Sequence, residues 1–302
     1  MRIRFDAPNE VLDKSMIDLA IAYRIYPGVS KTPAIFSEDK LKLSAFCLQS
    51  FKRALGNLRV KIWVLLDGCP PVYDELFKKI FLGDEIEIIR LQKAGNFATF
   101  SMQLELLSKQ QKAELVYFAE DDYFYFPDAL AKMVEFIRTG ADVDFVTPYD
   151  HPYAYQSPTK VERHLIRAFG DRHWRTTSST CLTFLARKGA LLATRQLMDT
   201  FSLGNDDGSI WMSITQKFGL LDPRVQGANK ERVKLWLKTW FWGYRRILFG
   251  KAFKLWEPLP SLATHIEAPC LAPVVDWNAE FRHVQEDALR IVEELSKKLG
   301  SQ

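Results

Sequence analysis

The sequence predicts an α/β fold, with a Rossmann-like, mixed and mostly parallel sheet and flanking helices. Two observations predict it. Through residues 17–147, short apolar runs alternate with longer segments in which apolar residues recur at helical spacing. Strand–helix–strand units of this length are typical of parallel strands joined by right-handed crossovers. With 302 residues, 47% of them hydrophobic, the chain is long enough to bury a sizeable core.

The first half of the chain holds five predicted strands and four predicted helices. The strands are residues 17–23, 59–66, 85–91, 115–119 and 143–147. The helices are residues 37–55, 72–81, 99–110 and 129–138. Turn-forming pairs stand between consecutive elements, at residues 27–28, 67–68 and 95–96.

The second half is less regular. We predict a loop at residues 150–155, a strand at 176–185, helices at 188–198 and 210–218, a basic aromatic helical segment at 230–256 and a solvated final helix at 278–299. A basic patch surrounds Trp174, made of His164, Arg167, Arg172, His173 and Arg175. We therefore divide the chain into a domain over residues 1–228 and a basic, aromatic helical segment with a C-terminal tail over residues 229–302.

Composition and charge narrow the range of functions. The net charge of +4 is modest, so a general role in nucleic-acid binding is not indicated. The cysteines form no CxxC pair, which is typical of thiols in a reducing compartment: Cys47, Cys69, Cys181 and Cys270. The N-terminus lacks the apolar core of a signal peptide, and no stretch reaches the roughly 18 apolar residues that a membrane span needs. We therefore expect a cytoplasmic protein.

An acidic cluster ends the fourth predicted strand. Glu120, Asp121 and Asp122 follow the apolar run 115–119 and precede an aromatic run. Adjacent carboxylates repel one another and are costly to desolvate, and a bound cation removes that cost. Oxygen ligands at the C-terminal end of a strand suit Mg²⁺ or Mn²⁺ shared with a substrate phosphate. The alternative is an acidic turn that faces water.

Polar residues also end the other parallel strands. Tyr23 and Arg24 end the first strand, Asp67 ends the second, and Asn96 follows the third. In this topology the C-terminal strand ends meet at one crevice, where ligands bind. No GxGxxG follows the first strand, which argues against a dinucleotide site, and the absence of GxxxxGK[ST] excludes a P-loop.

This ordered set of motifs resembles the GT-A glycosyltransferases, and among them the family-2 type, over about residues 17–220. The resemblance implies a bound nucleotide-sugar donor, with Asp67 reading the nucleotide base. It matches the acidic cluster to the family's DxD motif, so that Asp122 would hold the metal that bridges the donor diphosphate. The implied donor contacts are Tyr23, Arg24, Asp67, Asn96, Glu120 and Asp121. Two features depart from the family: Glu120 replaces the first aspartate, and Arg224 and Gln226 do not form a clear QxxRW motif.

A second acidic pair, Asp206 and Asp207, opens the predicted helix at residues 210–218. The resemblance implies that Asp207, with Asp206 in reserve, is the catalytic base that takes the proton from an acceptor hydroxyl. Asn205 and both acids are also good N-cap residues, so capping alone explains an acid at this place.

A histidine late in the chain is the second candidate metal ligand. Many GT-A enzymes carry such a histidine, and His265 stands in the matching place. Imidazole is an acceptable ligand for Mn²⁺ beside a carboxylate. The alternative is a structural histidine.

The segment at residues 230–256 has an unusual composition. It holds Trp236, Trp240, Trp242 and Trp256, and Glu231 is its only acid among many basic residues. Such a stretch fits the surface of an anionic membrane. The alternative is a helical hairpin that packs its aromatic rings on the sheet and leaves the basic groups in water. A nucleic-acid stacking surface is disfavoured by the enzyme-like first half.

Together these patterns predict a metal-dependent glycosyltransferase that uses Mn²⁺ or Mg²⁺. It would move a sugar to a hydroxyl of a glycan or lipid-linked saccharide, with residues 229–302 completing the acceptor side. An Asp207 base implies inversion, and without that base retention becomes possible. Two rivals stay open: a sugar nucleotidyltransferase, against which the single Gly28 in the first turn counts, and a non-catalytic module that docks on a membrane through residues 230–256.

Overall fold

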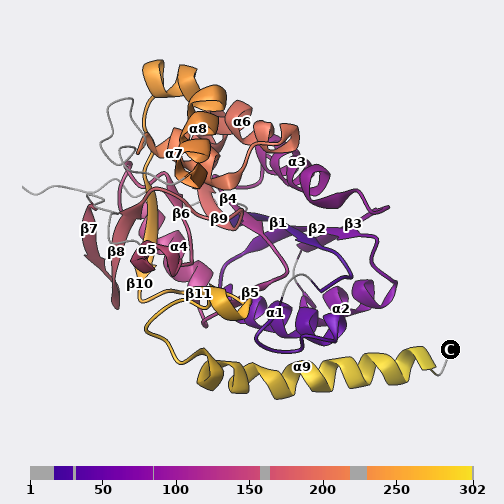
Figure 1. The fold of residues 1–302 in the computed structure, drawn as a ribbon. Helices are drawn as coiled ribbons and strands as arrows, with labels where there is room; N and C mark the ends of the chain where they lie inside the picture. Colours follow the sequence, from indigo (N-terminus) through magenta and orange to yellow (C-terminus); the bar gives the residue numbers. More distant parts are fainter. Residues whose placement is uncertain (1–16, 30–31, 84, 157–163, 218–229, 301–302) are drawn as a thin grey trace, which may run out of the picture.

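The computed structural model describes residues 17–29, 32–83, 85–156, 164–217 and 230–300 (Figure 1). The strands are β1 (Leu19–Ile25), β2 (Val60–Asp67), β3 (Glu85–Leu91), β4 (Leu115–Ala119), β5 (Tyr123–Tyr125), β6 (Phe145–Val146), β7 (Ile166–Phe169), β8 (Arg172–Thr177), β9 (Phe184–Arg187), β10 (Leu255–Leu259) and β11 (Ala263–His265). The helices are α1 (Lys40–Ala54), α2 (Val72–Ile80), α3 (Gly95–Lys109), α4 (Ala129–Arg138), α5 (Tyr153–Gln156), α6 (Lys188–Met198), α7 (Asp207–Thr215), α8 (Lys230–Phe249) and α9 (Trp277–Gly300), with short 3₁₀ turns at Asp199–Leu203 and Ala268–Cys270.

One mixed sheet runs through the described part of the chain, in the order β3-β2-β1-β4-β9-β6-β10-β8-β7. The strands β3, β2, β1 and β4 are parallel to one another, as the strand–helix alternation predicts. Beyond β4 the pairing is antiparallel except between β6 and β10. The predicted fold class, a mixed sheet flanked by helices with a helical C-terminal region, is confirmed.

Successive side chains of β1 alternate between two separate hydrophobic cores, one on each face of the sheet. Leu19, Ile21 and Tyr23 point to one face, where they pack with residues of α1, α2, α4 and α9. Ala20 and Ala22 point to the other face, where they pack with residues of α3, α6 and α7. Because successive residues of a strand point to opposite faces, an uninterrupted apolar strand needs helices on both sides. Figure 1 shows α1, α2 and α9 on one side of the sheet and α3, α6, α7 and α8 on the other.

Two segments of the second half differ from their predicted structure. The predicted strand at residues 176–185 is two strands, β8 and β9, separated by residues 178–183. Leu255 and Trp256, predicted as the end of the aromatic helical segment, instead begin strand β10. In both cases local composition suggested one continuous element, whereas pairing with distant strands sets the boundaries. The basic patch, for which no element was predicted, lies on the hairpin of β7 and β8 and just before it.

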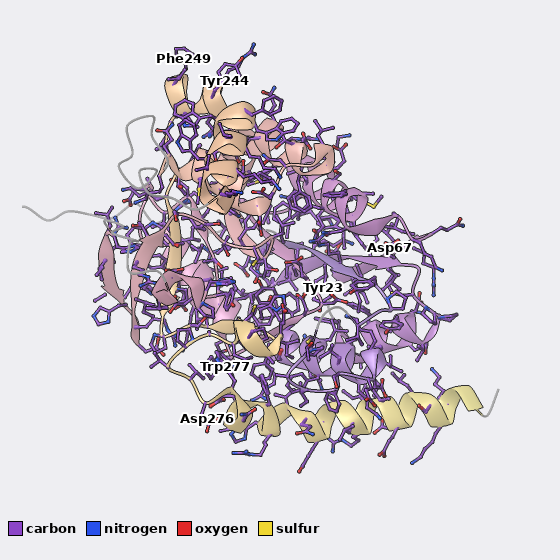
Figure 2. The ribbon with its side chains drawn as sticks, in the orientation of Figure 1. Tyr23, Asp67, Tyr244, Phe249, Asp276 and Trp277 are labelled. Carbon is purple, nitrogen blue, oxygen red and sulfur yellow. The ribbon has the colours of Figure 1, made fainter. Side chains whose placement is uncertain are left out.

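The C-terminal part of the chain returns to the sheet and its covering helices. Helix α8 packs along α7, and β10 lies between β6 and β8. Helix α9 lays an apolar stripe along α1, with Trp277 and Phe281 at its start; Figure 2 labels Trp277. The division at residue 228 stays a prediction. Among the described helices, none is long and apolar enough to cross a membrane.

Candidate active site

A cavity of about 560 Å³ opens at the C-terminal ends of β1, β2 and β4. It is lined by Arg24, Ile25, Tyr26, Pro27, Gly28, Asp67, Lys93, Gly95, Asn96, Thr99, Glu120, Asp121 and Asp122. Five of the six predicted donor contacts and one of the two predicted metal ligands therefore share this cavity. Their meeting follows from parallel pairing, which aligns the C-terminal ends of neighbouring strands.

Tyr23 is the exception among the predicted donor contacts. Its ring is 1% exposed and packs edge-on against Phe51 and Phe77 on the opposite side of the strand from Arg24. Figure 2 shows Tyr23 within the body of the molecule. Since neighbouring residues in a strand point to opposite faces, Tyr23 and Arg24 cannot both line the cavity. The structure therefore does not bring Tyr23 into the cavity with the other predicted donor contacts.

Arg24 is held in place by the acidic cluster and by α3. Its Nη2 lies 2.5 Å from Oε1 of Glu120, and its Nη1 donates to the carbonyl oxygen of Asn96 at 2.9 Å. The other carboxylate oxygen of Glu120, Oε2, accepts a hydrogen bond of 2.9 Å from the hydroxyl of Thr183. Glu120 therefore orients an arginine side chain that is only 9% exposed, and both carboxylate oxygens of Glu120 are engaged.

Asp67 anchors the start of α3. Its two carboxylate oxygens accept backbone N–H groups of Ala94 and Gly95, at 2.6 and 2.8 Å. These N–H groups lie at the first turn of the helix, where no carbonyl of the helix itself can accept them. The role that the structure gives Asp67 is therefore to fix the loop beneath the cavity, which differs from the base contact that the resemblance implies.

Asp121 forms a buried ion pair that the sequence did not reveal. Lys40, the first residue of α1, places its Nζ 2.5 Å from Oδ2 of Asp121, and both side chains are less than 10% exposed. Burial raises the pKa of Asp121 to about 6 despite the charge of Lys40. A lysine at the start of a helix is expected to face water, so nothing in its sequence context pointed to this pair.

Asp122 and His265 meet across the β5–β11 pairing. Nε2 of His265 lies 3.1 Å from Oδ2 of Asp122, while Oδ1 of Asp122 is buried with no hydrogen-bond partner among the described residues. Burial opposes the charge of Asp122, but the nearby His265, Lys40 and Arg24 outweigh it and lower its pKa. Asp122 is thus a carboxylate with one free oxygen at the floor of the cavity.

The free oxygen of Asp122 can serve as a ligand for a divalent metal ion. His265 is a poorer candidate, because its Nε2 carries a proton. Nδ1 of His265 accepts the backbone N–H of Glu267 at 3.2 Å, so the ring proton of the neutral imidazole lies on Nε2 and points to Asp122. Ligation through Nε2 requires that proton to leave. No group of three or more His, Cys, Asp or Glu side chains is arranged to hold a metal within the described ranges. A metal bound here would therefore need most of its ligands from substrate and water.

A second cavity, of about 330 Å³, contains Asp207. Its lining residues are His151, Ala154, His164, Arg175, Thr177, Ser178, Ser179, Thr180, Cys181, Asp207, Gly208, Met212, Leu235 and Glu257. Hydroxyl groups predominate on the wall formed by residues 177–180. The predicted catalytic base therefore lies outside the first cavity, in a polar cavity of its own.

Asp207 is a half-buried carboxylate with a high proton affinity. Burial, together with the charges of Asp206 and Glu120, raises its pKa to about 6. The backbone N–H of Gly208 donates to its Oδ1 at 2.8 Å and opposes this rise only in part. A carboxylate with such a pKa can accept a proton efficiently near neutral pH.

Asp206, the reserve candidate, is engaged in structure. Its Oδ1 caps α7 by accepting the backbone N–H of Ser209 at 2.8 Å. Its Oδ2 lies 2.9 Å from Nζ of Lys238 on α8. The sequence left open whether these acids cap the helix or act as a base. Asp206 caps α7, whereas Asp207 lines the second cavity.

The wall between the two cavities is the segment at residues 178–183. Cys181 lines the second cavity, while two residues later Thr183 donates to Glu120 of the first. The charge of Glu120 also acts on Asp207, so the acids of the two cavities lie within electrostatic range of each other. The two cavities are therefore neighbours separated by one short loop.

Arg175, a member of the basic patch, forms a charged network in the second cavity with partners that the sequence did not indicate. Its guanidinium contacts Glu257 at 2.5 Å and Asp150 at 2.9 Å, and it lies over the ring of Tyr155. Two carboxylates therefore offset its single positive charge. Because β10 supplies Glu257 and was not predicted as a strand, no sequence signal placed these three residues together.

Neither a protein-family model nor a curated protein sequence matches the chain. Among solved structures, it is similar to the glycosyltransferase GlyE of Streptococcus pneumoniae, with 13% identity and a TM-score of 0.43 over 94% of this chain and 64% of that one. It is also similar to the mannosyltransferase PcManGT of Pyrobaculum calidifontis in complex with GDP-Man and Mn²⁺, with 12% identity and a TM-score of 0.42 over 65% and 51%. Residues 1–349 of S. aureus TarS in complex with UDP-GlcNAc give 12% identity and a TM-score of 0.42 over 64% and 52%.

The chain thus spans about half the length of the PcManGT and TarS chains to which it is similar. A cytidylyltransferase from Leptospira borgpetersenii is also similar, with 11% identity and a TM-score of 0.34 over 59% of this chain and 64% of that one. Likenesses of this degree do not assign a reaction, which has to be argued from the two cavities.

Proposed function

We propose that the protein is a metal-dependent glycosyltransferase, with the donor in the first cavity and the acceptor in the second. The observation that carries this proposal is the placement of Asp207. A half-buried carboxylate with a raised pKa lies in a hydroxyl-lined cavity next to a strand-end cavity rich in charged groups. A transfer between two substrates requires two adjoining sites of this kind.

In the first cavity, a nucleoside diphosphate would be held by Arg24 and Lys93. Lys93 is exposed, has a left-handed backbone (φ 52°), and has no ion-pair partner among the described residues. The cavity has four carboxylates, at Asp67, Glu120, Asp121 and Asp122, against the three cations Arg24, Lys93 and Lys40. This excess of negative charge disfavours a diphosphate unless a divalent cation enters with it.

Asp122 would hold that cation through its free oxygen, with His265 fixing the other oxygen. When bound, Mn²⁺ or Mg²⁺ neutralises charge on the diphosphate as it leaves. His265 would become a direct ligand only if its Nε2 proton moves away. Arg24, oriented by Glu120, would donate to the same phosphate oxygens.

In the second cavity, Asp207 would take the proton from an acceptor hydroxyl as that oxygen attacks the anomeric carbon. Such a single displacement inverts the anomeric configuration, whereas retention would need a different arrangement. Arg175 is already neutralised by Asp150 and Glu257, so the cavity favours an uncharged sugar over an anionic acceptor. We propose a glycan or a lipid-linked saccharide as that acceptor.

A sugar nucleotidyltransferase would join a nucleoside triphosphate to a sugar 1-phosphate and would release pyrophosphate. Its acceptor is anionic, whereas Arg175 of the second cavity is already neutralised by Asp150 and Glu257, which favours glycosyl transfer. The two reactions differ in their products: one releases a nucleoside diphosphate and the other pyrophosphate.

The test is calorimetric titration of UDP, GDP and CDP into the protein, with Mn²⁺ and with a chelator. We expect one nucleotide to bind with Mn²⁺ and to bind at least tenfold more weakly in Asp122→Ala, because the free carboxylate oxygen is lost. Lys132→Ala, which removes an exposed ion pair with Asp171 outside both cavities, is the matched control and should bind as the parent does.

A screen of sugar nucleotides with the selected base then measures released nucleoside diphosphate, and a parallel screen of the matching nucleoside triphosphate with sugar 1-phosphates measures released pyrophosphate. Pyrophosphate release would replace glycosyl transfer by nucleotidyl transfer. If no nucleotide binds with or without metal, the enzyme proposal fails and the non-catalytic membrane-docking module takes its place.

A further inference from the structure

The outer face of α8 has a continuous exposed apolar stripe. Its members follow one another at intervals of three or four residues: Val233, Leu237, Phe241, Tyr244 and Leu248. At about 100° per residue they fall within an arc of about 80°. Their exposed fractions run from 37% at Val233 to 72% at Phe241. Phe249, 84% exposed, stands at the end of the helix, and Figure 2 shows it and Tyr244 projecting from the molecule.

This stripe is not the face that holds α8 on the protein. The opposite face packs on α7 through Thr239 and Gly243, which are both buried. Trp236, Trp240 and Trp242 lie between the two faces and are partly buried. The helix therefore has enough apolar surface to pack on α7 and still leaves a second apolar face in water, which is unusual unless that face has a partner.

Exposed basic residues border the stripe. On the helical projection Lys234 and Arg245 lie along one edge of it, and Lys230 lies within it, near the start of the helix. Arg245 extends over the ring of Tyr244 and donates to its hydroxyl at 3.0 Å. Lys251, with a side chain that is 69% exposed, continues the positive charge beyond the helix end.

We propose that this face of α8 docks the protein on an anionic lipid bilayer. Val233, Leu237, Phe241, Tyr244 and Leu248 enter the boundary between headgroups and acyl chains, while Lys230, Lys234 and Arg245 contact lipid phosphates. An apolar stripe bordered by Lys and Arg, with aromatic residues in the stripe, is the pattern that places a helix in the plane of such an interface.

Charge favours the bilayer over a second copy of this chain. In a two-fold dimer the same face meets itself, so Lys234 and Arg245 of each copy would approach the same cations of the other. A bilayer with anionic headgroups supplies the opposite charge along the whole helix, and it accepts Phe241 and Leu248 without a complementary pocket.

The docking face also bears on the proposed reaction. Leu235 of α8 lines the second cavity, beside Gly208 of α7. Docking through α8 therefore brings the second cavity close to the bilayer, which suits a saccharide attached to a membrane lipid. This last step rests on the proposed function, whereas the docking itself does not.

The test is flotation of the full chain with vesicles, which needs no substrate. We expect binding to vesicles of phosphatidylcholine mixed with phosphatidylglycerol, weak binding to phosphatidylcholine alone, and release in high salt. Phe241→Ser and Leu248→Ser should each lower the partition coefficient about tenfold. Lys234→Gln with Arg245→Gln should lower it further on anionic vesicles only, by about fivefold for each charge.

Matched controls come from exposed residues on other elements. Leu82→Ser removes an 86% exposed apolar residue beyond α2, and Arg53→Gln with Arg282→Gln removes two exposed charges from α1 and α9. These variants should bind vesicles as the parent does. Thermal unfolding of every variant tests whether the fold is kept, which we expect because the residues replaced are exposed.

Two outcomes would overturn the docking proposal. One is the absence of vesicle binding, or equal losses in the α8 variants and the controls. The other is a dimer in solution that Phe241→Ser converts to a monomer, which would make the stripe a self-association surface. Vesicle binding without nucleotide binding would keep the docking and remove the proposed reaction, so the two proposals can fail separately.

Discussion

At the scale of single residues, the surroundings of Asp207 decide what it can do. A free aspartate is fully charged at neutral pH and is a poor proton acceptor. Burial and the neighbouring acids Asp206 and Glu120 raise the pKa of Asp207 to about 6, which brings it close to the working range of a general base.

Asp207→Asn should lower the turnover number by about 10²–10⁴-fold while leaving Mn²⁺-dependent nucleotide binding unchanged. The reason is that the amide keeps the shape of the side chain but cannot take a proton, and the donor lies in the other cavity. Calorimetry and initial rates measure the two effects. Asp206→Asn is the control: it should leave turnover nearly unchanged, since asparagine also caps α7 and only the ion pair with Lys238 is lost. Equal losses of turnover in both variants would contradict the assignment.

The raised pKa of Asp207 also links its proton to stability. Its pKa in the folded protein lies above the value of 3.8 for an unperturbed aspartate, so the folded state binds the proton more tightly. The free energy of unfolding should therefore decrease as the pH rises from 3.8 to about 6. Asp207→Asn should remove this decrease and gain about 1–2 kcal/mol at pH 7, allowing for partial exposure. Urea unfolding at pH 5 and 7 measures it, and a less stable variant at pH 7 would contradict it.

Replacing Lys40 should destabilise the protein, whereas replacing Asp207 should stabilise it, because Lys40 compensates the buried charge of Asp121. Lys40→Met should lower the free energy of unfolding by about 3–5 kcal/mol at pH 7, since Asp121 is left charged and without its partner. The loss should shrink as the pH falls, because without Lys40 the pKa of Asp121 rises further and the carboxyl takes up a proton. The double variant with Asp121→Leu should recover much of the stability. Urea unfolding measures all three, and a single variant as stable as the parent would refute the role of this pair.

At the scale of elements, the first half of the fold could be predicted from the sequence and the second half only in part. β3, β4, α4 and α6 begin and end where periodicity and turn residues indicate. The hairpin β7–β8 and strand β10 could not be located, because Arg172–Thr177 and Leu255–Leu259 become strands by pairing with each other across about 80 residues of chain.

The candidate site shows the same limit. Residues at parallel strand ends, such as Arg24, Asp67 and Asp122, could be placed in one crevice from topology alone. Lys40 and Arg175 could not, since their partners come from elements that only the tertiary fold brings near. The opposite orientations of Tyr23 and Arg24 could have been predicted, because neighbouring residues of a strand point to opposite faces.

The contact between α7 and α8 depends on one glycine. A Cβ atom on Gly243 would lie 2.6 Å from Cβ of Ser213. Gly243→Ala should therefore lower the free energy of unfolding by about 1–3 kcal/mol, measured by urea unfolding.

Gly189→Ala in α6 is the matched control for this prediction, because a Cβ there meets no atom within 4 Å. Without a clash, alanine should gain up to about 1 kcal/mol through the lower entropy of the unfolded chain. Equal losses of stability in both variants would contradict a specific clash at Gly243.

At the scale of the whole molecule, one sheet joins parts of the chain that are far apart in sequence. Trp277 at the start of α9 and Gly243 of α8 lie on opposite faces of this sheet. Trp277→Ala should cost about 3–5 kcal/mol, because the indole is 3% exposed, contacts Phe124 and Phe281, and donates to the carbonyl of Ala272.

The double variant of Trp277→Ala and Gly243→Ala should lose the sum of the two single losses within about 0.5 kcal/mol, in one unfolding transition. Calorimetry and circular dichroism measure it. Two separate transitions would instead indicate that residues 229–302 unfold independently, as the predicted division at residue 228 would allow.

The place of β10 has a consequence for how the protein is made. This strand lies inside the sheet, between β6 and β8, yet residues 255–259 leave the ribosome after almost all of its neighbours. Until they emerge, β6 and β8 each present an unpaired edge, which is open to pairing with another nascent chain. The interval between the synthesis of β8 and that of β10 is therefore when this nascent chain is most open to wrong strand pairing.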